Sequence, residues 1–511
     1  MAKVQKFMAK FNTSYMRSVK VDVDVILFFL LLAILAALPL ITHTVMIQHI
    51  SPTINNAISD TGSYGDVVVY YKFIFLIITT IVLIGLFLYK MVVTNYTIKS
   101  SYINLPVTIM FLLIISSMLF SDYKTISVFG DFHRHQGALT FLSYLLIFII
   151  ASNTVFTKRK LRLIFHALIP LILVNTILSV INFYGYNIWP LVSMITFSFP
   201  TLAPGSFFGS TFGHPNHLSG IGSVLTLLFS TKAILTPATK DKILNILLST
   251  LSFTMVLCSL STSGFLTILI FIPLLALIVY KAPKSRVKLL TIISIIVLFS
   301  FVFITLNFHN NEIWNNSIGY FTNEGDPNSK KQTYNVKPKQ LDTAKPSEQL
   351  DDVDLSLPTP GVGPGNGRLY IWKKTIELIN KRPLLGYGLD TLGYYFPQGD
   401  SAKISNIGGG ENVFVDKPHN TYLGFVFGLG LPFLLVFALL IFRHFWEHIK
   451  IIKNYIDDEL HIMIMSLFIG WFAYLFQGLI NDPIASTAPV FWVLFGVNVS
   501  ILRELKELKN S

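Results

Sequence analysis

The sequence predicts an all-α polytopic integral membrane protein with about twelve transmembrane helices, and three observations support this fold class. Only 13% of the 511 residues are charged, whereas a soluble domain carries about a quarter. The apolar residues come in unbroken runs of about 18 or more, the length that a helix needs to cross about 30 Å of hydrocarbon. The runs are too long for barrel strands, and only helices or closed barrels satisfy every backbone group inside lipid.

Twelve apolar runs mark the predicted spans. The polar, basic segment before them is followed by a run that is too long for a signal-peptide core, so we expect this first run to remain as a span. The predicted spans are Val25–Ile47, Val67–Tyr89, Leu105–Phe120, Gly137–Phe156, Leu163–Phe183, Leu218–Leu235, Ile243–Leu260, Gly264–Tyr280, Leu289–Leu306, Tyr422–Phe442, His461–Ile480 and Pro489–Leu502.

The net charge of +12 has two interpretations, nucleic-acid binding or control of membrane topology. The positions favour topology, because 24 of the 39 Lys and Arg residues fall at the termini and in alternate segments between spans, and such residues gather in cytoplasmic loops. We therefore predict no nucleic-acid partner. The rule divides the chain into a cytoplasmic N-terminal segment (1–24), helices one to nine (25–306), a large extracytoplasmic loop (307–418), helices ten to twelve (419–502) and a cytoplasmic tail (503–511).

The long loop has two halves of different composition. Residues 310–364 are rich in Asn, Asp, Lys, Pro and Gly and poor in apolar residues, which predicts poor order. The second half begins with a stretch that places Leu369, Trp372, Ile376 and Ile379 on one helical face before Pro383. This spacing predicts an amphipathic helix against the bundle or at the membrane interface.

Topology alone brings several polar clusters to the outer surface. The cytoplasmic loops are short and basic and offer nothing comparable. The outer clusters are Arg134 within Gly130–Gly137, the segment Gly209–His217, the turn Ser261–Gly264, Arg368, the segment Lys417–Asn420, and the pair Asn481 and Asp482.

Each cluster has a chemical and a structural interpretation. Arg134 and Arg368 suit a pyrophosphate, because guanidinium offers forked donors to phosphate oxygens and stays charged; alternatively they extend to the membrane interface. His419 is a candidate general base, since imidazole titrates near neutral pH, or an interfacial histidine with satisfied hydrogen bonds. The loop Gly209–Asn216 either cradles an anion with its backbone amides or only shapes the entry to a helix.

Several other chemistries are not supported by the residue patterns. The glycine-rich stretch Gly361–Gly367 lacks the Lys-Ser/Thr of a phosphate-binding P-loop. Asp352 and Asp354 resemble a metal-binding pair but lie in the segment predicted to be least structured, and no Cys/His cluster has zinc spacing. The single Cys258 excludes an internal disulfide. The spans also lack the buried charges that ion-coupled transporters usually need.

The outer motifs resemble the O-antigen ligase/polymerase superfamily of membrane glycosyltransferases, which includes Wzy-type polymerases and WaaL-type ligases. The resemblance rests on the order of these motifs from the third helix onward, with the long loop placed before His419 and Asn420. The matching pieces are Arg134–Gly137, Gly209–Asn216, Arg368 with Trp372, Pro383–Gly388, Pro418–Tyr422, and Phe491-Trp492 with Gly496.

The resemblance implies a metal-independent, inverting transfer of an oligosaccharide from a polyprenyl diphosphate, without a cofactor. Arg134 and Arg368 would hold the diphosphate, and His419 would activate the acceptor hydroxyl. The other matching positions, expected to bind substrate, are Asn420, Thr211, His214, Asn216, Tyr422 and Ser261. The chain departs from the family at Thr262, where many members have Arg, and at His214, where Asn is more usual.

We therefore expect a multi-pass enzyme of the cytoplasmic membrane, surrounded by membrane lipids, that joins a polyprenyl-diphosphate-linked donor to a glycan or lipid-linked acceptor. Polymerase of a capsule or wall polysaccharide, such as a teichuronic-acid-type polymerase, is the first choice and ligase the second. The alternative from another class is a twelve-helix transporter or lipid-linked-glycan flippase, although the two related halves common in such proteins are not seen. A purely structural assembly partner is a third interpretation.

Overall fold

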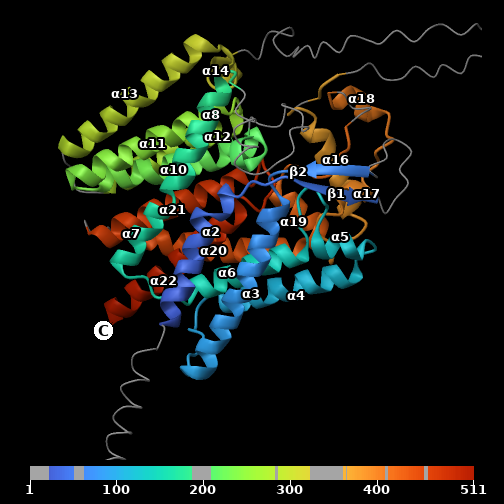
Figure 1. Cartoon of the computed structure of the whole chain (residues 1–511), viewed down its shortest axis with the longest axis horizontal. Helices are drawn as coiled ribbons and strands as arrows, with labels where there is room; N and C mark the ends of the chain where they lie inside the picture. Colours follow the sequence, from blue (N-terminus) through green and yellow to red (C-terminus); the bar gives the residue numbers. More distant parts are fainter. Residues whose placement is uncertain are drawn as a thin grey trace, which may run out of the picture.

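The structure is a computed structural model that describes residues 22–50, 62–186, 209–281, 286–322, 361–363, 365–408, 413–453 and 458–510. It is mostly helical, as predicted (Figure 1). The helices are α2 (Val23–Ala36), η1 (Leu38–Leu40), α3 (Tyr70–Val93), α4 (Asn104–Phe120), α5 (Lys124–Phe129), α6 (Ala138–Ser152), α7 (Lys158–Ala167), α8 (Ile169–Phe183), α10 (Pro215–Leu235), α11 (Thr239–Cys258), α12 (Thr262–Lys281), α13 (Arg286–His309), α14 (Glu312–Asn315), α15 (Gly319–Thr322), α16 (Arg368–Ile379), α17 (Leu392–Tyr395), α18 (Ala402–Asn406), α19 (Thr421–Leu429), α20 (Leu431–Lys453), α21 (Glu459–Gln477) and α22 (Ala488–Asn510).

Among the described residues, nine helices are long and apolar enough to cross a membrane, with α7 and α8 counted as one. Two shorter apolar helices, α4 and α6, accompany them. Each predicted span has a helical counterpart, whereas the count of twelve crossings stays a prediction. The predicted disordered half of the long loop lies largely outside the described residues, since 323–360 are not described.

The first connection corrects the all-helical expectation. The first span was predicted to run to Ile47, but its helix ends at Leu40, and β1 (Val45–His49) pairs antiparallel with β2 (Gly62–Asp66). Residues 45–49 alternate between half-buried and exposed, the two-residue period of a strand with one covered face. This short alternation was missed because an apolar run leads directly into it.

The predicted tenth span, Tyr422–Phe442, is wrong as a continuous helix. The helix is interrupted at Gly430, which has a φ of 83° and ends α19 before α20 begins. A side chain there would collide with the carbonyl of Leu384, so only glycine fits. The Leu431 amide donates to the Pro383 carbonyl at 2.7 Å, and the Tyr387 amide donates to the Phe427 carbonyl at 2.9 Å. The turn that follows α16 therefore packs against the interruption between α19 and α20.

Helix α16 forms as predicted, but it buries a different face. Leu369 and Ile376 are exposed, whereas Tyr370, Ile371 and Thr375 are buried together with Ile379. The buried residues pack with Val426 and Phe427 of α19 in a small separate cluster. The helix thus packs against the entry to α20, which the periodicity of its own sequence could not indicate.

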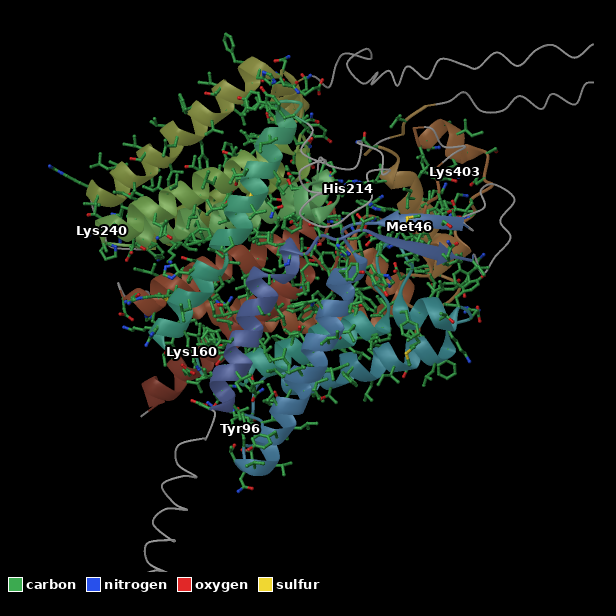
Figure 2. All side chains as sticks on the ribbon, viewed as in Figure 1. Met46, Tyr96, Lys160, His214, Lys240 and Lys403 are labelled. Atoms are coloured by element: carbon green, nitrogen blue, oxygen red, sulfur yellow. The ribbon has the colours of Figure 1, made fainter. Side chains whose placement is uncertain are left out.

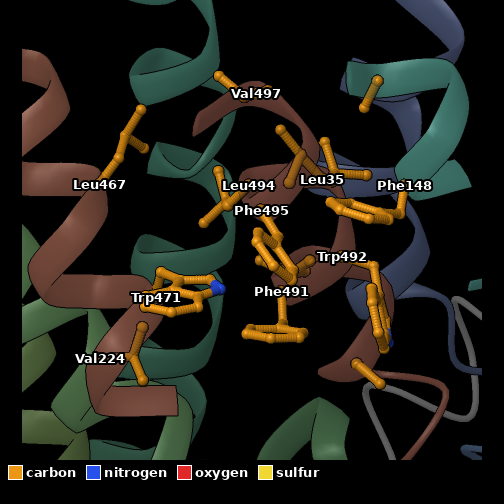
Figure 3. Packing of buried hydrophobic residues seen from close by; sticks show 14 of the residues in the cluster. Leu35, Phe148, Val224, Leu467, Trp471, Phe491, Trp492, Leu494, Phe495 and Val497 are labelled. Atoms are coloured by element: carbon orange, nitrogen blue, oxygen red, sulfur yellow. The ribbon is translucent and has the colours of Figure 1, made fainter. Parts of the chain in front are cut away.

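The central helix of the bundle is α10, whose span is 94% buried. Small residues let its neighbours approach closely: a Cβ added at Gly222 would lie 3.0 Å from the Val256 side chain, and one at Gly220 would lie 3.0 Å from Gln477 Oε1. Large aromatic residues fill the rest of the core, and Figure 3 shows Trp471 facing Phe491 and Phe495 between α21 and α22. Helix α10 therefore lies close against α11 and α21 near its N-terminal end.

The two predicted sides of the protein are separated in the structure. The hairpin, α16, α17 and α18 gather on one side of the bundle (Figure 1). Lys160 and Lys240, from predicted cytoplasmic segments, lie on the opposite side from Met46 and Lys403 (Figure 2). Which side faces the cytoplasm stays a prediction.

Candidate active site

The polar clusters predicted to share one surface converge in the structure. His214, at the start of α10, lies toward the side that holds the hairpin (Figure 2). The Ser261 hydroxyl donates to Asn216 Oδ1 at 2.8 Å, which joins the α11–α12 turn to the start of α10. Asn481 Nδ2 donates to the Asn216 carbonyl at 3.4 Å, which adds the end of α21. Segments far apart in sequence thus meet around the entry to α19.

A histidine–carboxylate pair occupies the middle of this region. His419 Nδ1 lies 3.1 Å from Asp482 Oδ2, and the side chains are 36% and 9% exposed, respectively. Burial disfavours the charged carboxylate, but the hydrogen bond from His419 and the charges of His419, Lys417 and Arg134 outweigh it and lower the pKa of Asp482. An ionised Asp482 at this distance favours the His419 tautomer that carries its proton on Nδ1 and leaves the lone pair on Nε2.

Hydrogen bonds to main-chain carbonyls just after α21 hold the residues beside His419. The Thr421 amide donates to the Gly478 carbonyl at 2.7 Å, and the Thr421 hydroxyl donates to the Asn481 carbonyl at 2.7 Å. Asn420 caps α19 by accepting from the Tyr422 and Leu423 amides, both at 3.0 Å. His419 itself has a φ of 53, a conformation that non-glycine residues adopt mainly where neighbouring contacts impose it.

A second attachment fixes the segment before His419. Trp372 Nε1, on α16, donates to the Pro418 carbonyl at 2.8 Å. Arg368 and Trp372, which the resemblance placed in one motif, both lie on the first turns of α16. Trp372 ties that helix to the histidine segment.

Arg134 is fully engaged with carboxylates. Its Nε donates to Asp390 Oδ1 at 2.8 Å, its Nη1 donates to Asp416 Oδ2, and its Nη2 donates to the Asp416 carbonyl at 3.3 Å. The arginine side chain is only 6% exposed. Burial alone would lower the pKa of Arg134, but Asp390, Asp416 and Asp131 raise it well above its ordinary value. This arginine is permanently charged and paired.

Two other cations are uncommitted. Arg368 and Lys417 are half-buried, and neither forms an ion pair with a carboxylate of the described residues. Burial lowers the pKa of Arg368, while the nearby charge of Asp482 opposes this. Burial, with the charges of Lys417, His419 and Arg368, lowers the pKa of His214 to about 4. Arg368, Lys417, His214 and His419 therefore lie close enough to interact electrostatically, together with the carboxylate of Asp482.

Three predicted substrate-binding residues, Thr211, Tyr422 and Asn420, use their polar side-chain groups in internal hydrogen bonds. Thr211 is buried, and both its amide and its hydroxyl donate to Asn175 Oδ1, at 3.1 and 2.9 Å. Its carbonyl accepts from Lys72 Nζ. Lys72 is a buried basic residue within the predicted second span, so the expectation that the spans hold no such residue is wrong at this position. The Tyr422 hydroxyl donates to the Leu475 carbonyl at 2.6 Å. The Asn420 side chain caps α19 and its Nδ2 donates to the Leu479 carbonyl at 3.0 Å. His214, Asn216 and Ser261 stay at the converging surface.

Sequence reasoning singled out Asp482 without a role, and it missed Asp390 and Asp416. Asp416 directly precedes Lys417 and the histidine motif, and Asp390 follows the glycine-rich turn after α16. Their position next to these motifs was the one local feature of the sequence that could have identified them as site residues. Their pairing with Arg134 depends on contacts between distant segments.

The fold and this site define a class: a multi-pass helical membrane protein with a histidine–carboxylate pair near Arg368 and Lys417, two cations that form no ion pair within the part of the chain that the structure describes. Residues 247–438 match the family model of the O-antigen ligases. The resemblance seen in the motifs is thereby confirmed over a range that contains Arg368, the Pro383–Gly388 turn and His419.

Relatives with similar sequences point the same way. Proteins of Rickettsia conorii and Rickettsia prowazekii that carry the provisional name polysaccharide ligase are 28% and 29% identical to this chain over 160 residues, or 31% of its length. The chain spans 36% and 37% of those relatives' own lengths.

Proposed function

We propose that the protein transfers an oligosaccharide from a polyprenyl-diphosphate-linked donor to a glycan acceptor hydroxyl at the outer face of the cytoplasmic membrane. The observation that carries the proposal is the His419–Asp482 pair beside the uncommitted cations Arg368 and Lys417. The family match and the named relatives support a polysaccharide-joining reaction.

In the proposed reaction, His419 is the general base. The acceptor oxygen forms a bond to the anomeric carbon of the donor while the bond from that carbon to the diphosphate oxygen breaks. The acceptor proton moves to His419 Nε2, and Asp482 stabilises the imidazolium through Nδ1. Attack opposite the leaving group inverts the anomeric configuration. No metal or nucleotide is required, because diphosphate is already a good leaving group.

Arg368 and Lys417 are the proposed diphosphate ligands. The electron pair of the breaking bond moves to the diphosphate oxygen, so the negative charge on the diphosphate rises in the transition state. Fixed cations in a partly buried site stabilise that charge more strongly than water does. His214 remains neutral at neutral pH, because its pKa is about 4, and it can therefore accept or donate a hydrogen bond without adding charge.

Arg134 keeps a place in the proposed site as a positioning residue. Its bonds to Asp390 and Asp416 favour this role over direct phosphate contact. Asp416 is the residue before Lys417, so the pair sets where Lys417 and His419 enter the site. The remaining proposed contacts are Asn420, Asn216 and Ser261, with Thr211 and Tyr422 supporting the loops behind them.

The test is complementation of cells that lack the protein, at matched membrane levels, with wild type, His419→Ala, Arg368→Ala and the control Lys373→Ala, which changes an exposed cation on the same helix. We expect wild type and the control to restore the glycan, and the other two to lose at least about a hundredfold. Long ladders restored by wild type identify a polymerase, and complete ladders lacking only their final attachment identify a ligase. Full complementation by both alanine variants contradicts the proposal and favours a transporter or flippase.

A further inference from the structure

A group of buried polar side chains lies inside the bundle where α20, α21 and α22 meet. The group, called the interior polar cluster below, consists of residues that are at most 1% exposed: His444, His448, Trp471 and Asn498. Trp471 lies about 10 Å along the helix from Gly478, at 1.5 Å per residue, and the Gly478 carbonyl accepts from the Thr421 amide. The cluster is therefore deeper in the bundle than the candidate active site.

The members of the interior polar cluster contact one another. The ring centroids of His444 and His448, one turn apart on α20, are 4.5 Å from each other, and Trp471 lies 4.6 Å from His444. Asn498 of α22 lies beside His448. Aromatic rings enclose the cluster, since Phe468 stacks on His448 at a centroid distance of 4.4 Å. Three helices thus place their polar groups in one apolar enclosure.

These polar groups are poorly satisfied by the protein itself. Within the part of the chain that the structure describes, five buried atoms of the cluster have no hydrogen-bond partner: His444 Nε2, His448 Nε2, Trp471 Nε1, Asn498 Nδ2 and Asn498 Oδ1. Figure 3 shows the indole nitrogen of Trp471 pointing toward the α22 residues Phe491 and Phe495. Buried polar atoms almost always have a partner, because leaving one unsatisfied costs its full desolvation free energy.

The chemistry of these atoms limits what the partner can be. His448 Nδ1 donates to the His444 carbonyl at 3.0 Å, so a neutral His448 has its lone pair on Nε2 and can only accept there. Trp471 Nε1 can only donate, and the Asn498 amide offers both a donor and an acceptor. A partner must therefore donate and accept, which a metal ion cannot do. Among the described residues, no group of three or more His, Cys, Asp or Glu side chains is placed to hold a metal either.

We propose that the interior polar cluster binds ordered water within the membrane-spanning bundle; this inference does not rest on the proposed function. Water donates and accepts, and a buried water makes about three hydrogen bonds, so the five atoms would engage about two molecules. Ionisable side chains inside membrane proteins commonly face such internal water. The bound water joins α20, α21 and α22 through hydrogen bonds that their side chains cannot make directly.

Polar side chains connect the cluster with the surface of the protein. The Tyr102 hydroxyl lies 2.6 Å from His444 Nδ1, and Glu447 is close to Tyr102. Glu447 is itself nearly buried and pairs at 2.8 Å with Lys506, whose side chain is 51% exposed. This series of polar groups gives water a route into the bundle.

The experiment is X-ray hydroxyl-radical footprinting of the full-length protein in lipid nanodiscs, read by mass spectrometry. X-rays generate radicals from bound water as well as from bulk water, and the radicals oxidise the nearest side chains. Trp471 is the reporter. Trp492 is the matched control, because it is 4% exposed and its ring neighbours are phenylalanines.

We expect Trp471, although it is 1% exposed, to be oxidised severalfold faster than Trp492 and at a rate comparable with that of Trp314, which is 36% exposed. Burial alone would give Trp471 and Trp492 the same low rate. Oxidation of Trp471 no faster than that of Trp492 therefore overturns the proposal.

Variants test which side chains hold the water. His448→Phe and Asn498→Leu remove hydrogen-bonding groups, so each should lower the oxidation of Trp471 to the level of Trp492, whereas His448→Gln should retain it. Ser500→Ala is the control on α22, because its buried hydroxyl donates to a main-chain carbonyl of another segment at 2.6 Å. It should leave the oxidation of Trp471 unchanged, and an equal loss in this control contradicts the assignment.

A bound metal is the competing outcome. A transition metal that the purified protein retains in stoichiometric amount, and that His448→Phe loses, overturns the assignment to water. Thermal unfolding shows whether each variant is folded. The comparison of Trp471 with Trp492 in wild type needs no variant and no glycan transfer, so it decides the proposal even if a variant fails to fold or the transferase proposal is wrong.

Discussion

His419 and Asp482 face each other across 3.1 Å, although they belong to the entry of α19 and the loop after α21. Asp482 is nearly buried and His419 is partly exposed, and the lowered pKa of Asp482 favours its charged form. A carboxylate on this side of the ring favours the imidazole tautomer with the proton on Nδ1, which leaves Nε2 to accept a proton.

Asp482→Asn should lower kcat by about a hundredfold or more with little change in KM. An amide can donate to His419 Nδ1, which moves the imidazole proton to Nε2 and removes the free lone pair. The measurement is steady-state transfer with a defined lipid-linked donor. Asp122→Asn, which alters an exposed carboxylate paired with Arg382, serves as the control and should retain wild-type kcat. A wild-type kcat in Asp482→Asn would show that the carboxylate does not direct the tautomer.

His214→Asn should flatten the dependence of stability on pH between about 6.5 and 4. Burial and nearby cations lower the pKa of His214 to about 4, so the unfolded chain binds more protons in this range and wild type loses stability as the pH falls. Protonation would also remove the Nδ1 lone pair that accepts from the Asn216 amide at 3.2 Å.

The measurement for His214 is the thermal midpoint in detergent across that pH range. Asparagine is a good helix N-cap, so the start of α10 should be kept at neutral pH while the titration is lost. Identical slopes for wild type and variant would mean that His214 titrates alike in the folded and unfolded protein.

Arg134→Ala should destabilise the protein by about 3–5 kcal/mol, because it leaves the buried carboxylate of Asp390 and that of Asp416 without their cation. Arg162→Ala is the matched comparison, since Arg162 forms an ion pair with Glu459 at an exposed position, and exposed pairs contribute little. Urea or thermal unfolding of the two variants measures the difference. Equal losses of stability in the two variants would show that burying the ion pairs of Arg134 adds nothing to the stability of the protein.

Gly430→Ala should destabilise the protein strongly, by more than the roughly 1–2 kcal/mol of a left-handed conformation alone. The added methyl group would also strike the Leu384 carbonyl. Gly85→Ala, in α3, provides the control because nothing lies within 4 Å of its added Cβ. The thermal midpoint and the yield of folded protein report both effects. A tolerated Gly430→Ala would mean that the break between α19 and α20 is set elsewhere.

The sequence predicted what depends on local chemistry. The long apolar runs identified the helices, because crossing lipid constrains each segment independently of its partners. The alternating charges grouped His419, Arg368, Asn216 and Ser261 on one side, and the contacts among these segments agree with that grouping. The family resemblance, carried by short motifs in order, was confirmed over 247–438.

The features that the sequence did not predict depend on contacts between distant segments. The partners of Arg134 come from Asp390 and Asp416, which no local pattern joins to it. Gly430 interrupts an apolar run without changing its hydropathy, so the break became visible only with the Pro383–Gly388 turn packed into it. The buried face of α16 is likewise set by α19 and not by the apolar stripe of its own sequence.

The bonds that hold the segment after His419 end on main-chain carbonyls of α21 and of the turn that follows it, including those of Leu475 and Leu479. Every residue type supplies a main-chain carbonyl oxygen. The side chains at this end of α21 can therefore be substituted during evolution without removing the hydrogen bonds that position His419. A lineage could thus reshape the surface around its base, for a different lipid or a different sugar, while the base itself keeps its place.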